Sequence, residues 1–219
     1  MGFIEEKPNI SRGNTMNCDE GHLGGYIRST KHQNSPGPSR EQGDPATWTP
    51  NLWLWVHERL GVRSVLDMGC GEGHSTKFFA ELGCDVLGLD GSLQAKRDSV
   101  ISDFHVIHDF VHGPFLLDRQ FDLVWCCEFV EHVEEQFSKN FLKTFLASGK
   151  YLMLTFASPG QPGWHHVNCQ PGSYWIKKLE AIGFFLDPFL TYESRNVAEP
   201  GHYQRKGLLF VRRGQSRPL

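Results

Sequence analysis

Short apolar runs alternate along the chain with longer stretches in which apolar residues recur every three or four positions. Such runs predict buried strands of a parallel sheet, and the longer stretches predict amphipathic helices. Strands are expected to end at 66 and to cover 85–90, about 104–108, 121–127 and 150–156, with further strands near 184–193 and 206–212; helices are expected at 48–60, 74–82, 128–146 and 173–182. This alternation predicts an α/β fold with a doubly wound sheet and crossover helices.

A glycine-rich turn follows the first predicted strand. Gly69, Gly71 and Gly73 occupy alternate positions, and a helical stretch begins at His74. Glycines in a strand-to-helix turn let the backbone bend sharply and approach a ligand closely. Loops that hold the pyrophosphate of a dinucleotide have the spacing G-x-G-x-x-G instead. Here the third glycine comes one residue early, and Asp67 before the turn would repel pyrophosphate and suit a ligand that carries positive charge.

The run from Val65 to Gly73 resembles the first motif of the class I S-adenosylmethionine-dependent methyltransferases, two hydrophobic residues followed by Asp/Glu-x-Gly-x-Gly-x-Gly. The cofactor of that family carries a cationic amine and a sulfonium but no phosphate, which agrees with a carboxylate at position 67. The resemblance covers about residues 48–212. It implies a Rossmann-like, doubly wound seven-stranded sheet with a terminal antiparallel hairpin, and ligands at the carboxyl ends of the strands.

The same resemblance implies a site for S-adenosyl-L-methionine. Asp90 ends the second strand, where an acid accepts hydrogen bonds from ribose hydroxyls, although it could instead cap the helix near Ser92. In the family, an acid after the third strand often contacts the adenine amino group beside an apolar neighbour, and Asp109 and Phe110 match those positions. The candidate cofactor contacts are Asp67, Gly69, Cys70, Gly71, Gly73, Asp90, Gly91, Asp109, Phe110 and Cys127.

Acidic and imidazole side chains gather after the fourth and fifth predicted strands. Glu128, Glu131 and His132 share one face if a helix begins at position 128, and His165 and His166 follow the fifth strand on the same rim. Such a set could hold a divalent ion. The Glu-x-x-Glu-His run resembles the ubiquinone-pathway O-methyltransferases and, with a further His downstream, the small-RNA 3′-end 2′-O-methyltransferases. The resemblance implies Mg²⁺ or Mn²⁺ ligands at Glu128, Glu131, His132 and His165, but the spacing does not choose between His165 and His166.

The rim also has a metal-free interpretation, which we favour. Acids are common in the first turn of any helix, and Glu-His at this place occurs in relatives without a metal. Methyl transfer to a hydroxyl requires an aligned acceptor and removal of its proton, for which an imidazole is suited. The predicted catalytic candidates are therefore His132, His165 and His166.

Composition limits the partners and the location of the protein. The 219 residues suit one domain with an extension, and we expect a flexible extension or lid over 1–46, including the island at 22–27, and a methyltransferase domain over 47–219. Six cysteines without a C-x-x-C pair, no secretory signal and no long apolar run predict reduced thiols in a cytoplasmic protein that is not bound to a membrane. The net charge of −3 makes a nucleic-acid partner unexpected.

We therefore expect a methyltransferase that acts on a hydroxyl of a small molecule or a sugar or glycan. The loop Gly163–Pro171 resembles methyltransferases encoded beside glycan-building enzymes, and Trp164 and Tyr174 would suit stacking on a pyranose. One alternative is an RNA 2′-O-methyltransferase with a metal-assisted site, favoured by the basic residues Arg205, Lys206, Arg212, Arg213 and Arg217. Others are a non-catalytic S-adenosylmethionine-binding protein and, disfavoured by Asp67, a nicotinamide-dependent oxidoreductase.

Overall fold

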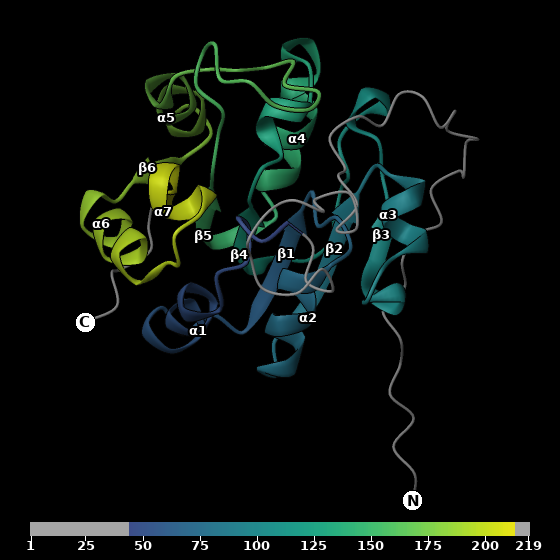
Figure 1. Cartoon of the computed structure of the whole chain (residues 1–219), viewed down its shortest axis with the longest axis vertical. Coiled ribbons are helices and arrows are strands. Elements are labelled where there is room, and N and C mark those ends of the chain that lie inside the picture. The colour runs from purple at the N-terminus through teal and green to yellow at the C-terminus, as the bar shows by residue number, and fades with distance from the viewer. Residues whose placement is uncertain (1–43, 213–219) are drawn as a thin grey trace, which may run out of the picture.

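The computed structural model describes residues 44–212, whose strands form one sheet in the order β3-β2-β1-β4-β5-β7-β6 (Figure 1). β1 to β5 run parallel, and β7 lies antiparallel between β5 and β6. The strands are β1 (Ser64–Met68), β2 (Asp85–Asp90), β3 (His105–Ile107), β4 (Phe121–Cys126), β5 (Ser148–Leu154), β6 (Phe184–Leu186) and β7 (Leu208–Arg212). The predicted doubly wound, seven-stranded sheet with a terminal antiparallel hairpin is confirmed. The lid predicted at 22–27 lies outside the described residues.

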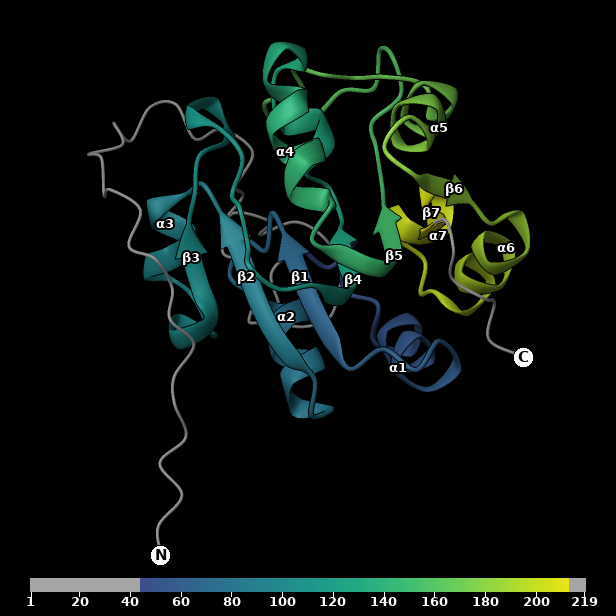
Figure 2. The ribbon, with the colours of Figure 1, turned by 180° about the vertical axis from the view of Figure 1, so that it is seen from behind.

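Helices cover both faces of the sheet and bury two apolar clusters. They are α1 (Pro50–Arg59), α2 (His74–Glu81), α3 (Leu93–Arg97), α4 (Ser138–Phe145), α5 (Gly172–Glu180), α6 (Pro188–Val197) and α7 (His202–Lys206). Side chains alternate across a strand, so Leu66 of β1 packs in the cluster under α4 and α5 while its neighbour Val65 packs in the cluster under α1, α2, α6 and α7. Figures 1 and 2 place α6 and α7 beside α1 at one edge of the sheet and α3 beside β3 at the other. No helix of the described chain is long and apolar enough to cross a membrane.

The aromatic residues at 48, 53 and 55, in and just before α1, pack against the core. Trp53 is 2% exposed, and its ring lies within 5.1–6.3 Å of the rings of Trp48, Phe78 and Trp125. Trp48 and Trp53 also reach the wall of the central cavity, which the sequence interpretation did not anticipate. The aromatic stripe therefore connects the packing of α1 to the site.

The strand predicted near 184–193 is mostly wrong, because only Phe184–Leu186 pair in the sheet and α6 begins at Pro188. The side chain of Asp187 accepts hydrogen bonds from the backbone N–H groups of Phe189 and Leu190, both at 3.0 Å. An acidic N-cap followed by proline is a helix start signal, and here it ends the strand and begins α6. The helix α7 was not predicted either.

The continuous helix predicted over 128–146 is also wrong. Two short 3₁₀ turns, Val130–His132 and Glu135–Phe137, precede α4. Glu128 has a positive backbone φ of 54°, which is incompatible with a right-handed helix start. The side chains of Glu128, Glu131 and His132 therefore do not share the helical face that their spacing suggested.

Two segments far apart in the sequence are joined beside the cavity. The hydroxyl of Thr49 donates to Glu199 at 2.8 Å, and the backbone N–H of His202 donates to the carbonyl of Ala46 at 2.9 Å. A Cβ on Gly201 would lie 2.2 Å from that carbonyl oxygen, so this close approach requires glycine. We call this contact between residues 44–51 and 198–203 the terminal seam.

Candidate active site

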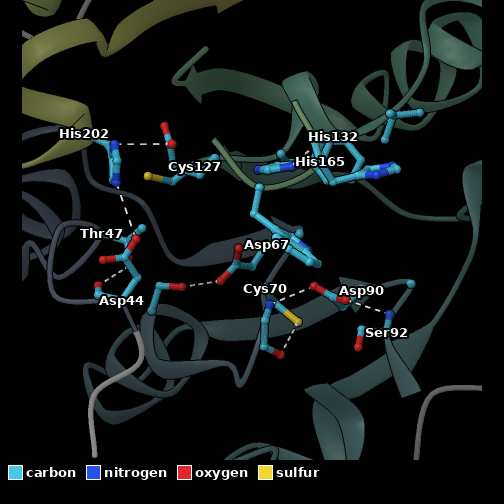
Figure 3. Close-up of a pocket in the computed structure, with 18 of the residues that line it drawn as sticks. Asp44, Thr47, Asp67, Cys70, Asp90, Ser92, Cys127, His132, His165 and His202 are labelled. Atoms are coloured by element: carbon cyan, nitrogen blue, oxygen red, sulfur yellow. Dashed lines mark hydrogen bonds and ion pairs between the residues drawn. The ribbon is translucent and has the colours of Figure 1, made fainter. Parts of the chain in front are cut away.

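A cavity of about 350 Å³ opens at the carboxyl ends of β1, β2 and β4 (Figure 3). Its wall contains all the predicted cofactor residues except Gly73, and all three predicted catalytic histidines. Of the four predicted metal ligands, Glu128, His132 and His165 reach the wall, whereas Glu131 does not. This position at the carboxyl edge of a parallel sheet is where open α/β folds bind ligands.

The glycine turn after β1 brings the backbone close to β2. The N–H groups of Gly69 and Cys70 both donate to the carbonyl of Leu89, at 2.8 and 3.0 Å. Gly71 has a φ of 55° and open space where a Cβ would lie, so a ligand can approach its backbone. Gly73 instead packs on Ile101, where a Cβ would meet Cγ1 at 2.1 Å. Gly73 therefore shapes the turn from behind and does not line the cavity.

Asp67 is buried at the end of β1, with 1% of its surface exposed. One carboxylate oxygen accepts hydrogen bonds from the hydroxyls of Ser75 and Thr76, at 2.5 and 2.7 Å. Burial raises the pKa of Asp67 to about 6, although the two hydroxyls oppose the shift. Among residues 44–212, Asp67 has hydroxyl partners but no cationic partner, so its carboxylate would attract a positively charged ligand.

We expect Asp67→Asn to flatten the dependence of stability on pH. The unfolded Asp67 carboxyl loses its proton near pH 3.8 and the folded one near pH 6, so Asp67 lowers the free energy of unfolding as the pH rises through this window. Above it the loss amounts to about 3 kcal/mol. Denaturant titrations of both proteins from pH 4 to 7.5 check this: the stability of wild type relative to the variant should fall with pH, and a constant difference would contradict the assignment.

Asp90 and Asp109 lie at the ends of the next two strands. The two oxygens of Asp90 accept from the N–H groups of Gly71 (2.9 Å) and Ser92 (2.8 Å), and burial raises its pKa. Asp90 therefore ties the glycine turn to the start of α3 while it faces the cavity (Figure 3). Asp109 accepts from the N–H of Val111 at 2.9 Å, beside the buried ring of Phe110.

Glu131, His132 and His166 come together on the rim opposite His202. One possible ligand atom from each lies within 4.8 Å of the others. Glu131 is fully buried, and neither of its carboxylate oxygens has a hydrogen-bond partner among the described residues. Burial, with the nearby Glu128 charge, raises the pKa of Glu131. The cluster thus contains His166 and not the predicted His165, and it omits Glu128.

The two histidines of this cluster are oriented by backbone carbonyls. Nδ1 of His132 lies 3.1 Å from the carbonyl oxygen of His165, and Nδ1 of His166 lies 3.2 Å from that of Gln161. A carbonyl only accepts, so a neutral ring in this position carries its proton on Nδ1 and has its lone pair on Nε2. Burial lowers the pKa of His132 to about 4, which keeps its ring neutral at pH 7. Both Nε2 atoms are therefore available to accept a proton or to ligate a cation.

Glu128 points away from this cluster, toward His202. Its N–H donates to the Thr155 hydroxyl at 2.7 Å, which in turn donates to Oε1 at 2.8 Å. Oε2 lies 3.2 Å from Nδ1 of His202, whose Nε2 lies 3.4 Å from Asp44. Figure 3 shows His202 on the side of the cavity opposite His132 and His165. Sequence analysis missed His202 and Asp44, since no local motif connects positions so far apart.

Comparison with known proteins agrees with this geometry. Residues 66–150 match the family described as methyltransferase domain. The ubiquinone biosynthesis O-methyltransferase of Paraburkholderia phytofirmans is 34% identical over 90 residues, which are 38% of this chain and 39% of that protein. The chloroplastic tocopherol O-methyltransferase of Arabidopsis thaliana is 30% identical over 136 residues, 56% of this chain and 36% of that protein. The match thus spans about two fifths of the length of these curated relatives.

Two solved structures resemble the chain over most of its length. The sugar N-methyltransferase KedS8 of a Streptoalloteichus species has a TM-score of 0.61 at 16% identity, covering 97% of this chain and all of that one. The CcbJ methyltransferase of Streptomyces caelestis has a TM-score of 0.59 at 13% identity, covering 91% of this chain and all of that one. At such identities the likeness concerns the fold.

Residues 66–150, which include the glycine turn after β1, therefore match a methyltransferase domain, and the seven-stranded sheet has the fold of the two solved methyltransferases.

Proposed function

We propose that this protein binds S-adenosyl-L-methionine and transfers its methyl group to a hydroxyl of a small molecule, with a sugar as the favoured acceptor. The observation that carries the proposal is the placement of Asp67, Asp90 and Asp109 at the ends of three adjacent strands around one cavity. The glycine turn leaves its backbone open to that cavity at Gly71. Five free cysteines among the described residues support the predicted reducing, cytoplasmic location.

Each group on the cofactor side has a chemical role that fits. Asp67 suits the cationic amine, Asp90 can accept from ribose hydroxyls because carboxylate oxygens take more than one hydrogen bond, and Asp109 and Phe110 suit the adenine amino group and ring. Cys70, Gly91 and Cys127 complete the wall. Burial raises the pKa of the Cys127 thiol well above its usual range, so we assign it a packing role and not that of a nucleophile.

The acceptor side must align a hydroxyl and remove its proton. When bound, S-adenosylmethionine supplies an electrophilic methyl group for in-line displacement. His132 and His166 offer Nε2 lone pairs that can take the hydroxyl proton, and fixed carbonyl contacts orient both rings. His165 contributes the carbonyl that orients His132. Trp164, 68% exposed on the cavity rim, offers a face for a pyranose ring.

Calorimetry with S-adenosylhomocysteine and NAD tests the cofactor assignment. We expect S-adenosylhomocysteine to bind and NAD not to bind. Asp90→Ala should lose about 1–3 kcal/mol of cofactor affinity, because a charged hydrogen-bond partner is removed. Asp103→Ala, which removes an exposed acid outside the cavity, is the matched control. Binding of NAD without S-adenosylhomocysteine would refute the assignment.

One observation favours a metal-assisted variant of this function. The unpartnered carboxylate of Glu131 and one ring nitrogen each of His132 and His166 are a donor set that fits a divalent cation, which would supply acidification of a bound hydroxyl. The RNA alternative gains less support. Arg212 donates to the carbonyl of Leu146 and Lys206 to the hydroxyl of Ser158, so these basic groups already have partners.

A further inference from the structure

We propose that the acceptor carries a protonated amino group and that molecules bearing phosphate or carboxylate are excluded. This inference rests on the proposed function and concerns the acceptor half of the same cavity. Seven carboxylates, and neither lysine nor arginine, are found among the described residues that line the cavity. Three of the acids, Asp67, Asp90 and Asp109, are assigned to the cofactor. Of the other four, Glu72 lies 3.0 Å from the His74 ring beside the glycine turn, and Glu134, Glu128 and Asp44 remain for the acceptor half.

Glu134 is the acidic residue on which the expected preference for an ammonium group mainly depends. It is half-buried on the wall of the cavity, and its side chain makes no hydrogen bond or ion pair with any residue of 44–212. Glu128 and Asp44 differ, because His202 lies between them. A partly buried carboxylate without a partner attracts a cation more strongly than an exposed one does, since less water screens it.

Lys206 and Lys178 are not among the residues that line the cavity. Lys206 donates to the hydroxyl of Ser158 at 2.8 Å and also contacts the side chain of Gln161. Lys178 pairs with Glu135 at 2.7 Å on the outer surface. An anionic acceptor would therefore meet carboxylates without a compensating guanidinium or ammonium group in the described wall, and its binding would be opposed by like charge.

Aromatic faces complete a surface suited to an ammonium group. Trp164 is largely exposed on the rim, and Trp48 is half-buried on the wall near Thr47. The face of an indole attracts a cation through its ring quadrupole, and carboxylates and indoles together are a common environment for bound ammonium groups. The amino group serves here as an anchor, while the methylated atom is the hydroxyl of the proposed function.

A set of four related sugars tests the inference on the protein loaded with S-adenosylhomocysteine. D-glucosamine, methyl glucoside, D-glucuronate and D-glucose 6-phosphate share a pyranose ring and differ in charge. Dissociation constants from NMR chemical-shift titrations should be at least about tenfold lower for D-glucosamine than for the other three, a difference of about 1.4 kcal/mol. Equal or tighter binding of either anion overturns the proposal, and so does the absence of binding by D-glucosamine.

Two variants test whether the preference for D-glucosamine depends on Glu134. Glu134→Gln should weaken D-glucosamine binding about threefold to tenfold and leave methyl glucoside unchanged. Glu180→Gln makes the same change of charge at an exposed position of α5 outside the cavity, and it should change neither. An amine preference that persists undiminished in Glu134→Gln overturns the role of this residue. Binding of S-adenosylhomocysteine is measured first and alone, so failure of the proposed function would be seen separately from failure of the amine preference.

Discussion

Replacing His166 or His132 by alanine is expected to lower the rate of methyl transfer by about 10²–10⁴ while leaving the affinity for S-adenosylhomocysteine unchanged. A ring nitrogen of each histidine lies within 4.8 Å of the buried Glu131 carboxylate, and neither histidine belongs to the strand ends assigned to the cofactor. His165→Ala should have a smaller effect, because the backbone carbonyl that holds His132 is kept. The rate is measured with labelled cofactor and an acceptor found in a panel of glycans and aminosugars.

A chelator separates the two roles that this cluster could play. If His132 or His166 acts as a base without a metal ion, a chelator leaves the rate unchanged. If Glu131, His132 and His166 hold an ion, a chelator abolishes turnover, added Mg²⁺ or Mn²⁺ restores it, and each single variant also weakens metal affinity measured by calorimetry. We expect the first result. His112→Ala, outside the cavity on a short 3₁₀ turn, is the control. Wild-type rates in both His132→Ala and His166→Ala would contradict the role of base and the role of metal ligand alike.

Gly73→Ala should lower the free energy of unfolding by about 2–5 kcal/mol. Two costs add at this position: the backbone φ is +87°, and the new Cβ would meet Cγ1 and Cδ1 of the buried Ile101 at 2.1 and 2.6 Å. Gly83→Ala isolates the first cost. Its φ is +81° and nothing lies within 4 Å of the new Cβ, so about 1–2 kcal/mol is expected. Denaturant titrations of both variants measure the difference. An equal decrease in the free energy of unfolding would show that the Ile101 side chain moves away from the new Cβ at no energetic cost.

The central part of the fold could be predicted from the sequence because local signals agree there. The runs that became β1, β2 and β4 are apolar, and turn residues bound them. At Asp187-Pro188 a helix start signal lies inside the apolar stretch that was predicted as one strand. Recognising the cap would have found α6.

The site could be predicted only in part, for a physical reason. The cofactor residues follow strand ends in one register, so their positions can be inferred from spacing. Glu128 takes a left-handed backbone conformation, with its N–H bonded to the Thr155 hydroxyl, and the backbone of Gly201 and His202 packs on the Ala46 carbonyl. Such tertiary contacts produce no periodic pattern in the sequence. They nevertheless decide which of the acidic residues and histidines around the cavity lie together.

The terminal seam has a consequence for the order in which the protein is made. Residues 44–51 emerge from the ribosome about 150 positions before Glu199 and His202, the partners to which Thr49, Ala46 and Asp44 are bonded. At about 5–20 residues per second, the early segment waits roughly 8–30 s for those partners. The wall of the cavity that contains Asp44 and Trp48 is therefore among the last parts to form, and a nascent chain halted before residue 198 has strands β1 to β5 but an open pocket.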